Sequence, residues 1–345
     1  QFGKEIQWEV DLLSGYDSEF VPNCARDPGT HHFGGLHNPE LPARLAAWRP
    51  DALLLFGYAW RSNLRALLWA RRRRVPVVLR GDSHLLGRAA PRGWRRLLLR
   101  ALLRQFSAFA YVGAANREFY RALGMDEKRL HFVPHAVNSS RFDPTEPTAR
   151  QTATRLRQSL GVEGKRVVLF AGKLQARKQP VELLRAFLEV ASERDALVFV
   201  GDGPLEPELK QLAASRPDRK VCFLPFANQS EMPAHYLLAD IFALPSRGAF
   251  ETWGLAVNEA MHLGVPCLVS DVVGCQPDLV IPGQTGWVFP STNIEALRTA
   301  LNEALRAPEA TLRGFGIAAR ERVAHYTYAH SGHALLRLLS MIRHD

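Results

Sequence analysis

Apolar residues in this chain occur in short continuous runs separated by longer amphipathic segments. In the first half, the runs alternate with helical patterns at 61–74, 88–106 and 114–123, and they lie at 52–56, 76–79, 108–112 and 130–133. In the second half, helical patterns at 179–193, 205–215, 231–238, 253–263 and 293–307 alternate with runs at 166–171, 196–201, 220–225, 241–245 and 265–269. Short apolar strands joined by helices are typical of parallel sheets covered on both faces. The pattern predicts two α/β halves.

A polar stretch at 138–164, which contains Pro144 and Pro147, separates the halves. We therefore predict an amino-terminal Rossmann-like domain over 1–143, a linker over 144–164 and a carboxy-terminal domain over 165–325. A last helix at 326–345 is expected to pack back on the first domain. The first domain opens at 6–10 without the strand and glycine-bearing turn that usually begin a doubly wound domain. We expect its first strand to be missing.

The composition is that of a globular chain. Of the 345 residues, 47% are hydrophobic and 23% are charged, and no apolar stretch approaches the roughly 18 residues that cross a bilayer. Three of the four cysteines lie in or beside apolar runs, without zinc or disulfide spacing, which indicates buried thiols in a reducing compartment. We expect a cytoplasmic protein.

The positive charge is concentrated in the first half. Residues 1–150 hold 23 Lys and Arg against 14 Asp and Glu, whereas residues 151–345 hold 21 against 20. Much of the excess comes from Arg71–Arg74 and from the segment 88–106. That segment has an apolar stripe of Trp94, Leu97, Leu98, Leu102 and Phe106, flanked by Arg92, Arg95, Arg96, Arg100 and Arg104.

Two interpretations of this segment stay open. It is either a helix that lies on an anionic membrane surface, at the inner face of the membrane, or a core-packed helix with a solvated arginine face. Nucleic acid is not an expected partner, because no recognisable binding module accompanies the charge.

Two glutamates, Glu251 and Glu259, lie eight positions apart around a predicted helix start. Gly254 allows close approach to the backbone, so the amides of Gly254, Leu255 and Ala256 can face an anion. Side chains on a helix lean toward its amino terminus, so Glu259 can reach the same place. Acidic residues at a helix start also oppose the helix dipole, which alone explains such a pair.

A second cluster makes the functional interpretation stronger. Lys173 and Lys178 follow the predicted strand at 166–171, in a loop that begins at Gly172. Open α/β sheets bind ligands at the carboxyl ends of their strands. Two lysines there can neutralise a diphosphate, while the carboxylates bind hydroxyl groups. A sugar nucleotide offers both chemistries.

Several other activities lack their motifs. The sequence contains no GxGxxG, GxxxxGK[ST], GxSxG or HExxH pattern, which disfavours dinucleotide, phosphate-loop, hydrolase and zinc-protease chemistry. It contains no Asp-x-Asp pair that would hold a metal-bound diphosphate. We expect no cofactor and no metal site.

The second half resembles the retaining glycosyltransferases of family 4, the glycosyl transferases group 1, which have the two-domain GT-B fold. The residues that carry this resemblance are Phe170-Ala-Gly-Lys173-Leu with Arg177-Lys178, Val200-Gly-Asp-Gly203-Pro204, Leu244-Pro-Ser246, Glu251 with Glu259-Ala-Met261, Gly264-Val-Pro266, Ser270-Asp271 and Gln284-Thr-Gly286-Trp-Val-Phe289. Val133-Pro-His-Ala-Val137 with Arg141-Phe142 resembles the family's end of the first domain. The fold implied is two Rossmann-like domains whose parallel sheets face an interdomain cleft.

The resemblance implies a role for each matching position. Lys173 and Lys178 would hold the donor diphosphate, Glu259 the ribose and Glu251 the transferred sugar. Phe226 and Asn228 would line the base pocket. Lys173 departs from the arginine usual there, Thr252 and Trp253 replace Pro-Phe, and Cys275 replaces a glycine.

His84 follows the predicted strand at 76–79. The resemblance suggests a cleft histidine near the anomeric carbon, although a lone loop histidine is more often structural. Arg80 and Asp82 are further candidates for acceptor contact.

The expected activity is metal-independent transfer of a hexose-type sugar with retention of configuration. Its partners are a nucleoside diphosphate-sugar and an unknown glycan, lipid-linked or small-molecule acceptor, in envelope polysaccharide or glycoconjugate synthesis. Two alternatives stay open. One is a catalytically silent sugar-nucleotide-binding protein, and the other is a sugar-nucleotide 2-epimerase on the same fold.

Overall fold

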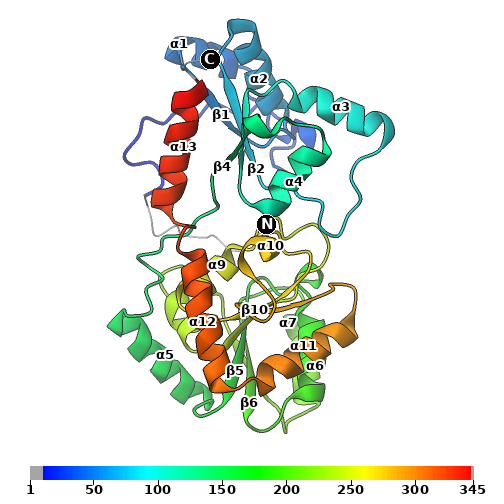
Figure 1. The fold of residues 1–345 in the computed structure, drawn as a ribbon, viewed down its shortest axis with the longest axis vertical. Helices are drawn as coiled ribbons and strands as arrows, with labels where there is room; N and C mark the ends of the chain where they lie inside the picture. Colours follow the sequence, from blue (N-terminus) through cyan, green and yellow to red (C-terminus); the bar gives the residue numbers. More distant parts are fainter. Residues whose placement is uncertain (1–10, 343–345) are drawn as a thin grey trace.

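The computed structural model describes residues 11–342, which form two parallel α/β sheets, one in each half of the chain (Figure 1). The first sheet has four strands in the order β1-β2-β3-β4. The second has six strands in the order β10-β9-β8-β5-β6-β7. Neighbouring strands in both sheets are parallel. The predicted fold class is confirmed.

The first domain contains the predicted strands with ends shifted by one or two residues. Its strands are β1 (Leu53–Phe56), β2 (Val77–Gly81), β3 (Ala108–Tyr111) and β4 (Leu130–Phe132). Its helices are η1 (Phe33–Gly35), α1 (Leu41–Trp48), α2 (Arg61–Arg73), α3 (Gly93–Leu103), α4 (Ala114–Ala122) and η2 (Glu127–Arg129). The expectation for residues 6–10 lies outside the described residues.

The second domain contains the strands β5 (Arg166–Ala171), β6 (Asp195–Val200), β7 (Lys220–Leu224), β8 (Ile241–Leu244), β9 (Cys267–Ser270) and β10 (Gly286–Phe289). Its helices are α5 (Pro147–Leu160), η3 (Ala176–Lys178), α6 (Pro180–Val190), α7 (Glu206–Ala214), α8 (Met232–Leu237), α9 (Leu255–His262), α10 (Gln276–Leu279), α11 (Ile294–Arg306) and α12 (Glu309–Val323). All six residues of β6 are buried. Helices on both faces of the sheet account for this continuous burial.

The segment predicted as a linker forms a helix, α5, which packs against α8. Glu146 caps it by accepting from the amides of Thr148 and Ala149, and Gly161 ends it with a φ of 61°. A capping residue followed by proline is a signal for the start of a helix. The segment was nevertheless predicted as a linker because its composition is polar. Ala153 of α5 is buried in the core of the second domain.

The chain returns to the first domain through its last helix, α13 (Tyr328–Ile342). Leu338 of α13 is buried against Val78 and Ala108 of the first sheet and against Val133, which follows β4. Figure 1 shows α13, in red, alongside that sheet. The two crossings between the domains meet at a β-bridge between Val137 and Thr327.

Helix α3 divides the apolar stripe that the sequence pattern predicted. It begins later than expected, at Gly93. Pro91 disfavours the helical conformation at Ala90, and Arg92 is extended at the N-cap. Leu103 and Phe106 are buried, but Trp94, Leu97 and Leu98 are 66%, 67% and 62% exposed. Arg92, Arg95, Arg96 and Arg104 are exposed on the same segment. The first turns of α3 therefore present an uncovered basic and apolar surface.

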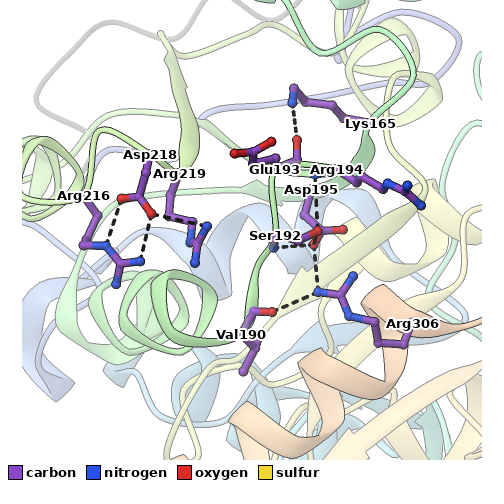
Figure 2. Close-up of polar contacts among 10 residues, drawn as sticks. All are labelled: Lys165, Val190, Ser192, Glu193, Arg194, Asp195, Arg216, Asp218, Arg219 and Arg306. Atoms are coloured by element: carbon purple, nitrogen blue, oxygen red, sulfur yellow. Dashed lines mark hydrogen bonds and ion pairs between the residues drawn. The ribbon is translucent and has the colours of Figure 1, made fainter.

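A polar cluster fixes the start of β6 (Figure 2). Asp195 is only 1% exposed. Its carboxylate accepts from the Ser192 amide at 2.7 Å, the Ser192 hydroxyl at 2.8 Å and Arg306 at 3.0 Å. Arg306 ends α11, so this carboxylate joins the turn before β6 to a helix from later in the chain.

We predict that Asp195→Ala lowers the free energy of unfolding by about 2 kcal/mol or more, because it leaves the partly buried Ser192 amide and the Arg306 guanidinium without their acceptor. The matched control is Asp218→Ala, since Asp218 pairs with Arg216 on the surface, where a pair contributes about 1 kcal/mol or less. Urea unfolding measures both. Equal losses in the two variants would contradict the assignment.

Candidate active site

The candidate site begins where two adjacent strands end. β5 and β8 pair in parallel, with Val168 opposite Ile241, so the loops that follow them leave the same edge of the sheet. The Arg247 amide donates to the Arg177 carbonyl at 2.9 Å. This bond ties the loop after β8 to the loop after β5. Two segments about 70 residues apart thereby form one surface.

Lys178 and Glu251 meet across these two loops. The Lys178 ammonium pairs with the Glu251 carboxylate, which also accepts from the Ser246 hydroxyl at 2.9 Å. The two side chains are 20% and 15% exposed, so the ion pair is partly shielded from water. Gly172 turns the first loop at a φ of 148°, a conformation that favours glycine. Lys173 follows it and is half-buried.

Helix α9 starts beside the Glu251 loop. Gly254 precedes it at a φ of 97°, and a Cβ there would lie 3.0 Å from Val273 and 3.2 Å from Leu244. Glycine is therefore required on both conformational and steric grounds. Leu255 is exposed and Ala256 is half-buried in the first turn. The first amides of a helix have no intrahelical acceptor and favour an anion.

Glu259 lies one turn further along α9. Its carboxylate accepts from the Tyr236 hydroxyl at 2.7 Å. Burial raises the pKa of Glu259 to about 7, an effect that the Tyr236 hydrogen bond and the charge of Arg141 reduce. Near neutral pH this carboxyl group exists in both protonation states, and any hydroxyl-bearing ligand of the charged form lowers its pKa.

A hollow of about 570 Å³ opens between α5 and the segment that follows β7. Phe226 lines it and is 46% exposed. Asn228 lies nearby in the backbone turn before α8, where its amide donates to Glu231 at 2.8 Å. Of the two predicted base-pocket residues, Phe226 forms part of the wall, whereas Asn228 shapes the turn behind it.

His84 of the first domain reaches the Glu251 loop. The imidazole is fully buried, and its Nδ1 accepts from the Leu86 amide at 3.1 Å. Nε2 has no hydrogen-bond partner within residues 11–342. Burial lowers the pKa of His84, Arg88 lowers it further, and the nearby Glu251 backbone opposes the shift. A neutral imidazole with an N–H on Nε2 therefore faces the Glu251 loop.

Asp82 makes a second contact between the domains. It accepts from the Thr252 hydroxyl at 2.6 Å and lies 3.8 Å from His135. Arg80, the other candidate for acceptor contact, instead donates to the backbone carbonyls of Val133 and Pro134. Of the two candidates for acceptor contact, Asp82 therefore lies where the domains meet, and Arg80 supports the backbone of the first domain.

A third interdomain contact places Asp278 at the amino terminus of α4. Its two carboxylate oxygens lie 3.0 and 2.9 Å from the Ala114 amide, and the Tyr326 hydroxyl donates to one of them at 3.3 Å. Burial raises the pKa of Asp278 to about 6, despite these hydrogen bonds. A Cβ on Gly113 would lie 2.4 Å from the Trp253 ring, so the domains are in close contact here.

Several of these residues could not be found from the sequence. Ser246 belongs to a quoted motif, but nothing in the motif indicated its bond to Glu251. Tyr236 and Asp278 gave no local signal, because their contacts join positions 23 and 164 residues apart.

One group of side chains has metal-ligand chemistry. Asp27, His31 and His32 place three ligand atoms within 4.8 Å of one another on an exposed loop. The Gly34 amide donates to Nδ1 of His32 at 3.1 Å, which puts the proton on Nε2, the atom that would bind an ion. We assign no metal to this group. In the described part of the chain, no helix has the length and apolar character to span a bilayer.

Two family models match the chain. The model for glycosyl transferases group 1 matches residues 152–322, and the model for the glycosyl transferase 4-like domain matches residues 15–136. The first therefore covers the Lys178, Glu251 and Glu259 segments, and the second covers His84.

Among relatives, a GDP-mannose-dependent alpha-(1-6)-phosphatidylinositol monomannoside mannosyltransferase of Mycolicibacterium smegmatis is 30% identical over 254 residues, which are 71% of this chain and 65% of the relative. The sulfoquinovosyl transferase SQD2 of Arabidopsis thaliana is 26% identical over 84% of this chain and 56% of its own length. The chain thus spans less than two thirds of the length of these relatives.

Two solved structures share the fold. HepE of Anabaena, in complex with UDP and glucose, has a TM-score of 0.69 at 19% identity, with coverage of 88% of this chain and 82% of its own. Sucrose-phosphate synthase of Thermosynechococcus elongatus has a TM-score of 0.66 at 23% identity, with coverage of 87% and 75%.

We predict that Glu259→Gln stabilises the protein at pH 8. The folded-state pKa of about 7 exceeds the ordinary 4.5, so the stability linked to this group is greatest below the lower value and is lost as the pH rises through the higher one. The glutamine side chain does not ionise, so the variant keeps this stability. Its free energy of unfolding at pH 8 should exceed that of the parent by roughly 1 to 3 kcal/mol.

Urea unfolding at pH 8 and pH 5 measures the effect, which should be smaller at pH 5. Glu303→Gln, on the exposed face of α11, is the control and should change little at either pH. A Glu259→Gln variant less stable than the parent at pH 8 would contradict the claim that the charged Glu259 carboxylate destabilises the folded protein.

Proposed function

The chain belongs to the glycosyl transferases group 1 family, and from this premise we propose that it transfers a sugar from a nucleoside diphosphate-sugar to an acceptor. The observation that carries the proposal is the contact between Lys178 and Glu251 at adjacent strand ends, beside the first turn of α9. This surface offers a cation and helix amides for a diphosphate, and carboxylates for sugar hydroxyls.

In the proposed reaction, the diphosphate of the donor binds between Lys173, Lys178 and the first amides of α9. Its charge replaces Glu251 as the partner of Lys178, which frees the Glu251 carboxylate to accept from hydroxyls of the transferred sugar. Negative charge grows on the diphosphate as the sugar departs. A lysine and amides that are already in place stabilise that charge more in the transition state than in the ground state.

Glu259 is proposed to accept from the ribose hydroxyls, which favours its charged form. His84 is proposed to donate from its unpartnered Nε2 to the transferred sugar. We propose a metal-independent reaction that retains configuration: the acceptor attacks the face that the diphosphate leaves, and a phosphate oxygen takes the acceptor proton. Contact between the domains around Asp82 and Asp278 supports exclusion of water from this step.

The acceptor and the donor base stay open in this proposal. The mannosyltransferase relative is described as GDP-mannose-dependent, whereas the HepE structure contains UDP and glucose. A glycan, lipid-linked or small-molecule acceptor in envelope or glycoconjugate synthesis fits the site. Lys178 and Glu251 are both present and pair with each other, and Glu259 is held by Tyr236. A complete set of these side chains disfavours a catalytically silent binding protein.

We also propose that the exposed surface of α3 binds an anionic membrane at its cytoplasmic face. Trp94, Leu97 and Leu98 are uncovered there, and Arg95 lies 5.5 Å from the Trp94 ring centroid. Apolar side chains that enter the headgroup region and arginines that meet anionic lipid together favour such binding.

We predict that Lys178→Ala and Glu259→Ala each lower turnover by about 100-fold or more, because each removes a group that contacts the donor. Thermal-shift screening with UDP-, GDP- and ADP-sugars first identifies the donor, since a ligand of the native state raises the melting temperature. Release of nucleoside diphosphate from that donor then measures turnover. The control is Lys210→Ala, which removes an exposed lysine side chain of α7. Rates near the parent's in either site variant would overturn the site assignment.

We predict that the chain binds vesicles containing phosphatidylglycerol in preference to pure phosphatidylcholine vesicles. Replacing Trp94, Leu97 and Leu98 together by serine should weaken this binding at least about tenfold, since it removes the buried apolar area. Cosedimentation measures the bound fraction. Leu336→Ser removes an equally exposed leucine on α13 and should leave binding intact. Equal binding to both vesicles would refute the membrane proposal.

A further inference from the structure

The hollow of about 570 Å³ includes His235 in its wall, next to Tyr236, whose hydroxyl donates to Glu259. It opens at the carboxyl end of β7, and Arg141 in its wall also acts on the charge of Glu259. A ribose held by Glu259 would therefore place its base at or in this hollow. The inference below rests on the proposed function, because it concerns the base of the same sugar nucleotide.

Two carboxylates line the hollow together with Phe226. Glu146 lies at the start of α5, and Glu231 lies at the start of α8. Glu146 is held by the Thr148 and Ala149 amides at 3.1 and 2.6 Å, and Glu231 by the Asn228 amide at 2.8 Å. Backbone bonds thus fix both groups before any ligand enters.

Arg141 adds a guanidinium to the same wall. It donates to the Gln229 side chain at 2.9 Å, which anchors it next to the turn that holds Glu231. The wall therefore combines an aromatic face, two fixed carboxylates and one cation. A base that binds here must donate to carboxylate oxygens and accept from a guanidinium.

The four common bases differ in how well they meet this requirement. Guanine presents two adjacent donors, N1–H and N2–H₂, and two acceptors, O6 and N7. Uracil has a single N3–H between two carbonyl oxygens, which a carboxylate repels. Adenine and cytosine each place a ring-nitrogen acceptor beside their amino group. Guanine alone supplies paired donors for a carboxylate and paired acceptors for an arginine.

Helix capping explains Glu146, whereas Glu231 makes no capping bond to α8. Both carboxylates nevertheless line one hollow together with the exposed ring of Phe226. A half-exposed aromatic side chain in such a wall is suited to stacking on a base. We infer that this hollow is a guanine-binding pocket and that the donor is a GDP-sugar.

The test is isothermal titration calorimetry of the full chain with GDP, UDP, ADP and CDP. We expect GDP to bind at least about tenfold more tightly than the others, since one good bidentate contact discriminates by that order. Glu231→Gln is the diagnostic variant, because the glutamine oxygen can still accept from the Asn228 amide while the charge is lost. It should weaken GDP at least about fivefold and leave UDP unchanged. Glu208→Gln, an exposed residue of α7, is the matched control.

The outcomes separate this inference from the proposed function. Preference for UDP, ADP or CDP overturns the guanine assignment and leaves the sugar-nucleotide site intact. Equal loss of GDP and UDP binding in Glu231→Gln also overturns it, because the residue would then act on folding rather than on the base. Failure of all four nucleotides to bind overturns both.

Discussion

The ion pair between Lys178 and Glu251 joins the loops that follow two adjacent parallel strands, β5 and β8. Because it is partly buried, each charge depends on the other for stabilisation in the absence of ligand. The same arrangement makes the pair exchangeable. A diphosphate can take over Lys178, and sugar hydroxyls can take over Glu251, so ligand binding replaces one set of charge-assisted bonds with another.

The surroundings of this pair are arranged at a cost in stability. Burial raises the pKa values of Glu259 and Asp278 toward neutral pH, and His84 leaves Nε2 without a partner among the described residues. Unsatisfied polar groups and destabilised charges tend to gather at functional sites. Glu259 lies on α9, whereas His84 and the amide partner of Asp278 belong to the first domain. His84 and Asp278 therefore place part of this cost where the two domains meet.

Much of the architecture could be predicted from the sequence. Apolar runs located β1 to β9 to within one or two residues, because buried parallel strands are continuously hydrophobic. The strand β10 was not among the predicted runs. Glycine positions and charge spacing identified Gly172, Gly254, Lys178 and Glu251. The contacts of Tyr236, Thr252 and Asp278 could not be predicted, since they join distant segments whose relative position depends on the whole fold. The α5 helix was missed because its polar surface resembles that of a linker.

The central claim is that both loops and α9 bind one donor molecule. A crystal structure of the chain with a bound nucleoside diphosphate tests it most directly. The account predicts phosphate oxygens within hydrogen-bond distance of Lys178 Nζ and the first amides of α9, with the ribose against Glu259 and the Lys178–Glu251 pair opened. A nucleotide bound elsewhere, with that pair intact, would contradict it.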